Sequence, residues 1–404
     1  MKIENIEQIF ERYQEKKIRL ETISGKKTYV FRNNRNILDG KLIKQLIDFF
    51  SKIRQRRLKL SIFLDLGRVR IADKLSYTVL ECLVYQLITE EFSVQVKYVP
   101  ETSIETKGIE FSCLNYLNPA SKKFIQDRKK RESQFLKNFD IYQAQFNKYR
   151  KWLSPKNTSY LSDLSSDLIH LFRNQSKFIN AYYHKQYEYD DRMVKKLSNT
   201  ISELVGNAIE HGQSNCLIDI DISHNFIHKD YEDKQFGAIN IVILNFSKIN
   251  FGDKVRNKIL SGDFSNNERY QLVSDAYAIH SEMFNENYPE EVFWNIASIQ
   301  DKISGRLDNF NNGGKGSTDL LKSIQEFAYL DYCYMMSGND ILKLNKSFLA
   351  LDDDGFIGFN NISFKLQMPD DSTYSKSAVY LPGVAYNLNF ILEEKKNDNN
   401  KITI

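Results

Sequence analysis

The segment Ile201–Gly212, ISELVGNAIEHG, places a carboxylate and a carboxamide one helical turn apart. If this segment is a helix, Glu203, Asn207 and His211 stand on one edge at positions i, i+4 and i+8, beside an apolar stripe. The amide oxygen of Asn207 is a hard ligand suited to Mg²⁺, and Glu203 can act as a general base toward a water. The pair predicts a magnesium and water site, although the same spacing also fits an ordinary surface helix.

A second candidate segment is the glycine cluster Asn311–Gly316, NNGGKG, which precedes a predicted helix over Thr318–Phe327. Glycine lets backbone N–H groups approach phosphates, and a helix N-terminus favours anions. The candidate phosphate contacts are Gly314, Lys315, Gly316 and Ser317. The segment is not a Walker A sequence, because the required spacing is absent, and a plain glycine-rich turn is the alternative.

The elements around these residues are predicted from periodicity. Asn215–Ser223 alternates as a strand, with isoleucines on one face and Asp219 and Asp221 on the other. Ala238–Leu244 is apolar and β-branched, so the two strands are expected to pair across a polar loop at 224–237. Residues 253–310 are polar and helical, and an apolar strand at 385–392 ends the ordered chain.

The first part of the chain alternates between strand and helix patterns. After an amphipathic helix within residues 1–20, the predicted strands are 27–32, 58–66 and 94–99, and the predicted helices are 42–53 and 76–87. This pattern is typical of an α/β domain. A charged and aromatic stretch at 118–152 predicts a long helix that ends at Ser154-Pro155. The resulting domains are 1–110, a helical connector at 111–188, a third unit at 189–394 and a flexible tail at 395–404.

Composition limits the functional classes. The chain has 404 residues, of which 42% are hydrophobic and 27% charged, as in globular proteins. No apolar run approaches the ~20 residues that span a bilayer, so no membrane partner is expected. The four cysteines are scattered without a CxxC pair, which favours a reducing cytoplasm over a disulfide or zinc framework. Abundant Asn, Lys and Ile indicate an AT-rich, bacterial genome.

Nucleic acid is an unlikely partner on these grounds but is not excluded. The net charge of +4 is small for this length. The basic stretch Lys122–Arg131 could contact phosphates. Asp127 and Glu132 interrupt it, which favours a solvated helix face.

Three segments together resemble the GHKL (Bergerat-fold) ATPases, which include sensor histidine kinases, anti-sigma-factor kinases, type II topoisomerases and mismatch-repair ATPases. Residues 203–212, ELVGNAIEHG, look like the family's N-box, in its anti-sigma-factor version. Gly314-Lys315-Gly316 looks like the second glycine box, and Leu381–Tyr386 resembles the segment that leads into the last strand. The resemblance covers roughly residues 160–392 and implies ATP and Mg²⁺ as cofactors. It implies that Glu203 activates the water, that Asn207 holds Mg²⁺, and that His211 and the glycine box contact the nucleotide.

The first glycine box departs from the family pattern D-x-G-x-G. Asn245 stands at the aspartate position that would face the adenine, and Ser247 and Ile249 replace the two glycines. An asparagine oxygen can accept from the adenine amino group without the charge, and its amide can also donate, which would relax base preference. The substituted glycines restrict backbone approach. The site therefore binds nucleotide by a variant geometry, binds it weakly, or belongs to a pseudo-ATPase.

A second resemblance lies in the N-terminal region. Residues 62–73, IFLDLGRVRIAD, look like a segment of STAS domains, the anti-sigma-factor antagonists that GHKL kinases phosphorylate. Lys74 and Leu75 stand where the acceptor serine would be, so this resemblance implies a docking module; an unrelated α/β domain is the alternative. The predicted fold class is α/β (an α+β sandwich), with a STAS-like domain, a helical connector and a Bergerat-type domain built on a mixed sheet and a helical layer.

The leading functional hypothesis is a cytoplasmic, ATP-binding conformational switch in bacterial stress signalling or phage defence. Segment 253–310 would form its lid. Nucleotide and a protein partner are expected, with a homodimer as an open arrangement. Two alternatives remain: a catalytically inactive scaffold that keeps the fold, and an anti-sigma-like serine kinase that acts on a separate protein.

Overall fold

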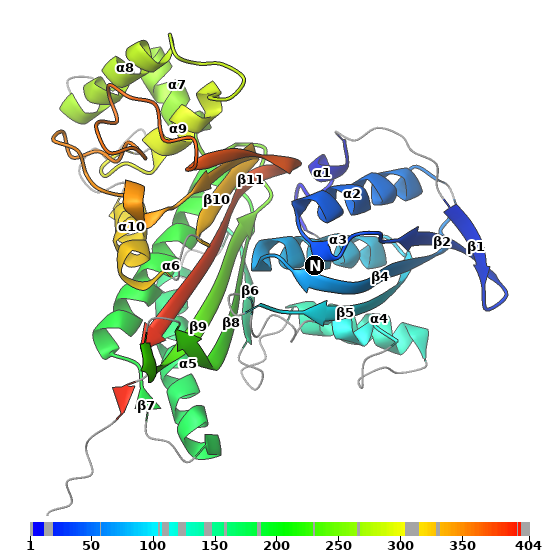
Figure 1. Ribbon diagram of the computed structural model, residues 1–404. Helices are drawn as coiled ribbons and strands as arrows, with labels where there is room; N and C mark the ends of the chain where they lie inside the picture. The colour runs from blue at the N-terminus through cyan, green and yellow to red at the C-terminus, as the bar shows by residue number, and fades with distance from the viewer. Residues whose placement is uncertain are drawn as a thin grey trace, which may run out of the picture.

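The chain is a mixed α/β protein built on two five-stranded sheets (Figure 1). The computed structural model describes residues 3–11, 19–56, 58–103, 106, 113–119, 127–140, 148–156, 160–183, 187–228, 231–264, 267–303, 315–328, 332–393 and 395–396. The first sheet is mixed and carries α-helices, and the second sheet is antiparallel.

The first sheet confirms the predicted alternation of strands and helices in the N-terminal part. Its strands are β1 (Arg19–Ile23), β2 (Lys26–Arg32), β3 (Ile37–Leu38), β4 (Ser61–Ile71) and β5 (Ser93–Glu101). Central β4 runs parallel to β2, β3 and β5, while β1 is antiparallel to β2. Helices α2 (Gly40–Arg54) and α3 (Lys74–Thr89) each begin after an aspartate, because Asp39 and Asp73 accept from backbone N–H groups of the first turn.

The second sheet has the order β10-β11-β9-β8-β6. Its strands are β6 (Lys148–Leu153), β8 (Cys216–His228), β9 (Tyr231–Asn245), β10 (Tyr334–Lys343) and β11 (Tyr374–Glu393). Each described pair is antiparallel, which corrects the expectation of a mixed sheet. The predicted polar loop at 224–237 is also wrong, because β8 and β9 continue through it until His228 pairs with Tyr231.

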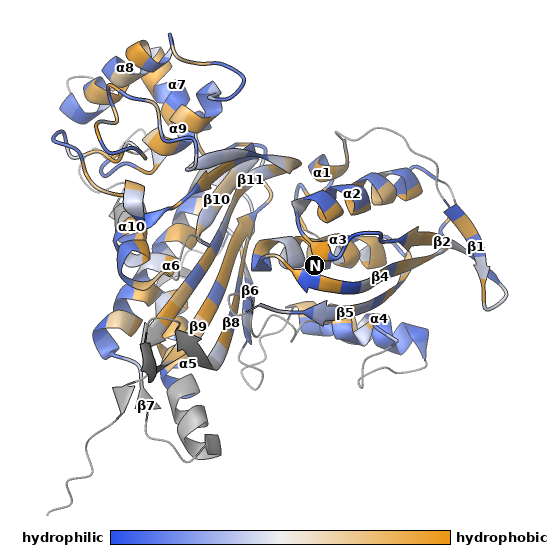
Figure 2. Ribbon diagram, viewed as in Figure 1, coloured by the Kyte–Doolittle hydropathy of each residue, from blue (hydrophilic) through white to orange (hydrophobic). Residues whose placement is uncertain are grey.

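A layer of helices covers one face of this sheet (Figure 1). It contains α5 (Tyr160–Tyr183), α6 (Asp191–Gly212) and α10 (Lys315–Phe327). The isoleucines that alternate along β8 and β9 point into a common core with this layer. Figure 2 shows the resulting apolar stripes on the strands. The helices α7 (Asp253–Ser261), α8 (Glu268–His280) and α9 (Glu290–Ser298) form a further group beyond β10 and β11.

The opposite face of the second sheet packs against the N-terminal part. Leu217, Val242 and Leu244 share one core with Val79 and Leu83 of α3. The predicted alternation of β8 is therefore confirmed, and its acidic face is buried against α3 instead of facing water. The antiparallel sheet thus lies between two helical layers.

The region predicted as a helical connector contains strands as well as helices. Within 118–152 the structure has the helix α4 (Arg128–Asp140), while Lys148–Leu153 forms β6 at the edge of the second sheet. The long-helix prediction is wrong there, because the cationic side chains of Lys148 and Arg150 pair with acidic side chains of β8. Part of the basic stretch, residues 122–126, lies outside the described residues.

Both ends of the chain differ in part from the predictions. The N-terminal helix is α1 (Gln8–Glu11), and residues 19–20, expected at its end, begin β1. At the other end, the strand β12 (Lys395–Lys396) pairs with β7 (Tyr187–Glu188), within the tail predicted to be flexible. Two short 3₁₀ helices, η1 (Cys113–Tyr116) and η3 (Lys346–Phe348), complete the described elements. Among the described helices, none combines the length and apolar character needed to cross a bilayer.

Candidate functional site

Helix α6 carries the Glu203 and Asn207 pair, as its periodicity predicted. Its stripe of Ile201, Leu204 and Ala208 is buried against the sheet. Glu203 is exposed and Asn207 is half-buried, so both lie on the edge of the helix that borders the solvent. The backbone of His211 belongs to α6, but its side chain lies outside the described part.

Helix α6 ends without a glycine in the left-handed cap position. Gly212 is the last helical residue, and Gln213 adopts the left-handed conformation after it, with φ 50°. The need for glycine at 212 is steric: a Cβ there would lie 2.0 Å from Nδ2 of Asn245. Gly212 is therefore required by close packing against β9 and not by a left-handed turn.

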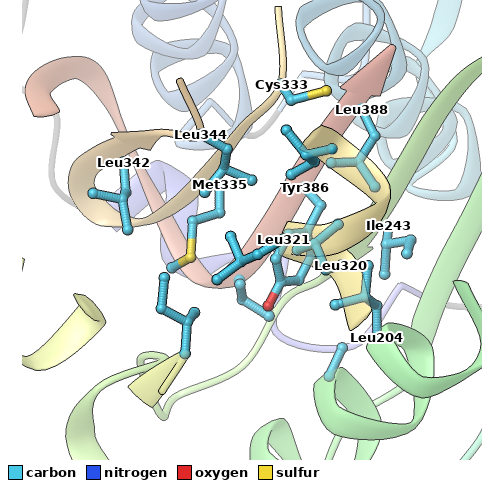
Figure 3. Close-up of a cluster of buried hydrophobic side chains, with 14 of the residues drawn as sticks. Leu204, Ile243, Leu320, Leu321, Cys333, Met335, Leu342, Leu344, Tyr386 and Leu388 are labelled. Atoms are coloured by element: carbon cyan, nitrogen blue, oxygen red, sulfur yellow. The ribbon is translucent and has the colours of Figure 1, made fainter. Parts of the chain in front are cut away.

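Helix α10 runs antiparallel to α6. Lys196 pairs with Glu326, and the hydroxyl oxygens of Thr200 and Ser323 lie 3.2 Å apart. Residue numbers therefore increase along α6 in the direction in which they decrease along α10. Both helices rise by ~1.5 Å per residue. Asn207 lies seven residues after Thr200, and Gly316 lies seven residues before Ser323, so the first turn of α10 is level with Asn207. In Figure 3, Leu204 of α6 and Leu320 of α10 belong to the same cluster of side chains.

The helix predicted after the glycine cluster is confirmed as α10, and it lies beside α6. Lys315, Gly316 and Ser317 form the first turn of α10, which begins earlier than Thr318. Gly314 lies outside the described residues, and the side chains of 315–317 are not described. The arrangement brings the backbone of this turn to the same level of the helical layer as Asn207.

Asn245 is fully buried at the end of β9, and its amide joins three elements. Nδ2 donates to the carbonyl oxygen of Ala208 in α6 at 2.5 Å, and Oδ1 accepts from the N–H of Val384 in β11 at 2.9 Å. Gly383, with φ 89°, permits this junction, since a Cβ there would lie 2.5 Å from Oδ1. In this arrangement both ends of the Asn245 amide bind backbone and the side chain is fully buried, so the predicted contact with a base would require Asn245 to become exposed.

Two further side chains close the C-terminal end of α6. The Ser247 hydroxyl donates to the carbonyl oxygen of Gly212 at 2.7 Å, and Nζ of Lys254 donates to that of Glu210 at 3.0 Å. Last-turn carbonyls lack helical partners, and a cation near them is favourable. Neither role was predicted. Ser247 departs from the glycine of the D-x-G-x-G pattern, and this departure was the signal in the sequence.

His280, the last residue of α8, connects the group of helices α7 to α9 to Phe364 through hydrogen bonds. Its Nε2 lies 2.9 Å from the carbonyl oxygen of Phe364, which can only accept, so Nε2 holds the proton. Nδ1 then accepts from the Tyr288 hydroxyl at 2.7 Å. Burial lowers the pKa of His280, because the charged imidazolium loses its hydration. The prediction of helices within 253–310 is confirmed for α7 to α9, and residues 304–314 lie outside the described part.

A second cluster of chemically active side chains lies between the two sheets. Three cations, Lys74, Lys148 and Arg150, meet three carboxylates, Glu81, Asp219 and Asp221. Nε of Arg150 lies 2.8 Å from Asp219, and its Nη2 contacts both Asp219 and Glu81. Nζ of Lys74 lies 3.1 Å from Asp219 and also contacts Asp221.

The charges of this cluster balance, and each carboxylate has a cationic partner. Burial alone would raise the pKa of Asp219, but Arg150, Lys148 and Lys74 outweigh it and hold that pKa well below its usual range. Paired in this way, the six groups act as a structural junction between α3, β6 and β8.

The donor set suits magnesium only in part. No group of three His, Cys, Asp or Glu side chains in the described residues could hold a metal ion. Asn207 offers one hard oxygen, so a magnesium ion here would depend on phosphate oxygens for further ligands. The phosphate side of a nucleotide site thus fits these residues, whereas the base side does not fit Asn245 as it is bonded. Comparison of the chain with protein-family models, with curated proteins and with solved structures finds no match in any of the three.

Proposed function

We propose that the C-terminal part of the chain is a Bergerat-type nucleotide-binding domain that works as a conformational switch. The observation that supports this proposal is the placement of the first turn of α10 beside the Glu203 and Asn207 edge of α6. Backbone N–H groups at a helix N-terminus attract phosphate, and a carboxamide oxygen nearby suits Mg²⁺. Both groups are carried on helices packed against one antiparallel sheet.

In this proposal each group of residues has a separate role in nucleotide binding or hydrolysis. Asn207 would hold Mg²⁺, the turn Lys315–Ser317 would bind phosphates, and Glu203 would orient or deprotonate a water. When bound, ATP with its magnesium would supply a phosphoryl group that hydrolysis can remove. Glu203 is exposed and free to reach a water, but its exposure also leaves the water poorly confined, so slow hydrolysis is expected.

Recognition of the base should be weak. The Asn245 amide already binds Ala208 and Val384. A base that replaced these bonds would leave a buried carbonyl and N–H unsatisfied, which costs about 1–3 kcal/mol for each group. We therefore expect binding led by phosphate and magnesium, with little preference for adenine over guanine.

Calorimetry on three proteins tests this proposal. Wild type is expected to bind ATP with Mg²⁺ and to lose binding in EDTA. Asn207→Ala should weaken binding by about tenfold or more, the loss of one strong polar contact. Asn199→Ala is the matched control, since Asn199 is an exposed asparagine on the same helix whose amide oxygen accepts from the Ser165 hydroxyl in a surface contact. If wild type shows no Mg²⁺-dependent binding, the proposal is refuted.

Hydrolysis is tested separately by phosphate release. Glu203→Gln should abolish any release that wild type shows, while Glu210→Gln, a change of the same kind at an exposed position of the same helix, should leave it unchanged. Equal rates for both variants would remove Glu203 from the proposed role and leave nucleotide binding intact.

A second candidate function is a scaffold that keeps the fold without using nucleotide. The bonding of Asn245 favours it, because a side chain at the base position holds α6, β9 and β11 together instead. In either case the N-terminal, STAS-like part is proposed to receive a protein partner. The scaffold predicts no nucleotide binding by wild type and by Asn207→Ala alike, so the calorimetry above separates the two.

A further inference from the structure

A cavity of about 290 Å³ lies between the N-terminal part and the second sheet. Its walls come from the starts of α2 and α3 on one side and from β10 and β11 on the other. In Figure 1 these elements meet where the two parts of the molecule join. Ligand cavities occur preferentially at such junctions, and this volume is near the lower end of their usual range.

Most of the lining is apolar. Val79 of α3 and Met336 of β10 belong to the core that joins α3 to the second sheet, and Ile43 and Leu381 extend the wall on either side. A hydrocarbon or aromatic group placed here would leave water for an apolar surface. The body of any ligand should therefore be apolar.

One end of the cavity is polar. Asp73 accepts from the N–H of Ser76 at 2.6 Å and from the hydroxyls of Ser76 and Tyr334. Asn387 also lines this end, but its amide is engaged: Oδ1 accepts from Leu75 N–H and Nδ2 donates to the Tyr332 carbonyl, each at 3.1 Å. A carboxylate has about four acceptor sites, so Asp73 retains capacity for another donor.

The Asp73 carboxyl also lacks a cation. No Lys, Arg or His nitrogen of the described residues lies within 4 Å of it. The neighbouring Lys74 is directed to Asp219 and Asp221, and Lys343 lines the cavity without pairing with Asp73. Burial raises the pKa of Asp73, and the nearby Asp39 adds to this effect. A positive group placed beside Asp73 would offset this effect and stabilise the ionised carboxylate.

We propose that this cavity binds a small apolar or aromatic amine, with its ammonium group at Asp73 and its hydrocarbon body against Val79 and Met336. The ligand would bridge α3 and β10, and would therefore stabilise the junction between the two parts of the chain. The proposal does not depend on nucleotide binding.

Three probes with one carbon skeleton test the proposal by calorimetry on the full chain. 2-Phenylethylamine should bind at least about tenfold more tightly than 2-phenylethanol, because a hydrogen bond to a charged group contributes about 1.5–3 kcal/mol. Phenylacetate should bind more weakly than both. Equal binding of amine and alcohol, a preference for phenylacetate, or no binding of any probe would each overturn the proposal.

Two variants and one control locate the site. Asp73→Asn keeps the acceptor that caps α3, so it should fold, and it should abolish the preference for the amine. Asp39→Asn removes an equal charge outside the cavity lining and should keep that preference. Val79→Phe should fill the cavity and weaken binding of amine and alcohol alike. An amine preference that survives Asp73→Asn would assign binding elsewhere and refute the proposal.

Discussion

Replacing Arg150 by methionine tests whether the buried charges hold the two sheets together. Arg150 is 2% exposed and contacts Glu81, which is itself fully buried. The substitution changes three cations against three carboxylates into two against three. Asp219 keeps Lys74 at 3.1 Å and Lys148 at 3.4 Å, so the cost falls mainly on Glu81. Removal of one partner from a buried pair costs about 3–5 kcal/mol, and we expect the lower end, about 3 kcal/mol.

Urea unfolding measured by tryptophan fluorescence provides the assay. The chain has two tryptophans, Trp152 on β6 beside the charge cluster and Trp294 on α9. Unfolding of a chain of this size can have more than one step, so each tryptophan should be followed alone after the other is changed to phenylalanine. Arg150→Met should lower the free energy of unfolding reported by Trp152 more than that reported by Trp294.

Two further proteins make the result decisive. Adding Glu81→Gln to Arg150→Met removes the carboxylate charge that has lost Arg150 and should recover at least half of the loss. Arg173→Met breaks an exposed pair with Asp191 and should cost no more than about 1 kcal/mol. If Arg150→Met costs as little as Arg173→Met, the reasoning that the cluster is a buried junction is refuted.

Two other predictions follow from single side chains. Asn245→Ala should lower the free energy of unfolding by about 2–4 kcal/mol, because the Ala208 carbonyl and the Val384 N–H each lose a partner in a buried site; a loss below about 1 kcal/mol in urea unfolding would contradict this. His280 has a folded pKa below its unfolded value of about 6.5, so its contribution is present above that pH and is lost as the pH falls through the window below it. Trp294 fluorescence should therefore report weaker packing of α7 to α9 at pH 5.5 than at pH 7.5, and His280→Leu should remove this difference.

Periodicity predicted most elements because burial imposes it directly. The isoleucines of β8 and the stripe of α6 repeat at 2 and about 3.6 residues, as the sheet face and the helix face require. The strand β6 was missed because it is short and its charged residues resemble a solvated helix. Lys148 and Arg150 face Asp219 from 69 or more positions away, and such pairing is invisible along the sequence.

The candidate site was also predicted only in part from the sequence. Glu203 and Asn207 share one helix, so their spacing placed them together. The bonding of Asn245 depends instead on Ala208 and Val384, which lie on two other elements. The departure from the family pattern marked the position as unusual, but only the folded arrangement shows that its amide binds backbone.

Strand β6 has a consequence for the exposed edge of the second sheet. It covers one edge of β8, a strand of 13 residues, and it is itself only six residues long with lysines at 148 and 151. Short, lysine-bearing edge strands discourage pairing with another molecule. A fragment that begins after Leu153 would present the β8 edge with unpaired backbone groups and with acidic side chains stripped of Arg150. We expect such a fragment to aggregate, so residues 148–153 should be retained whenever the C-terminal part is studied by itself.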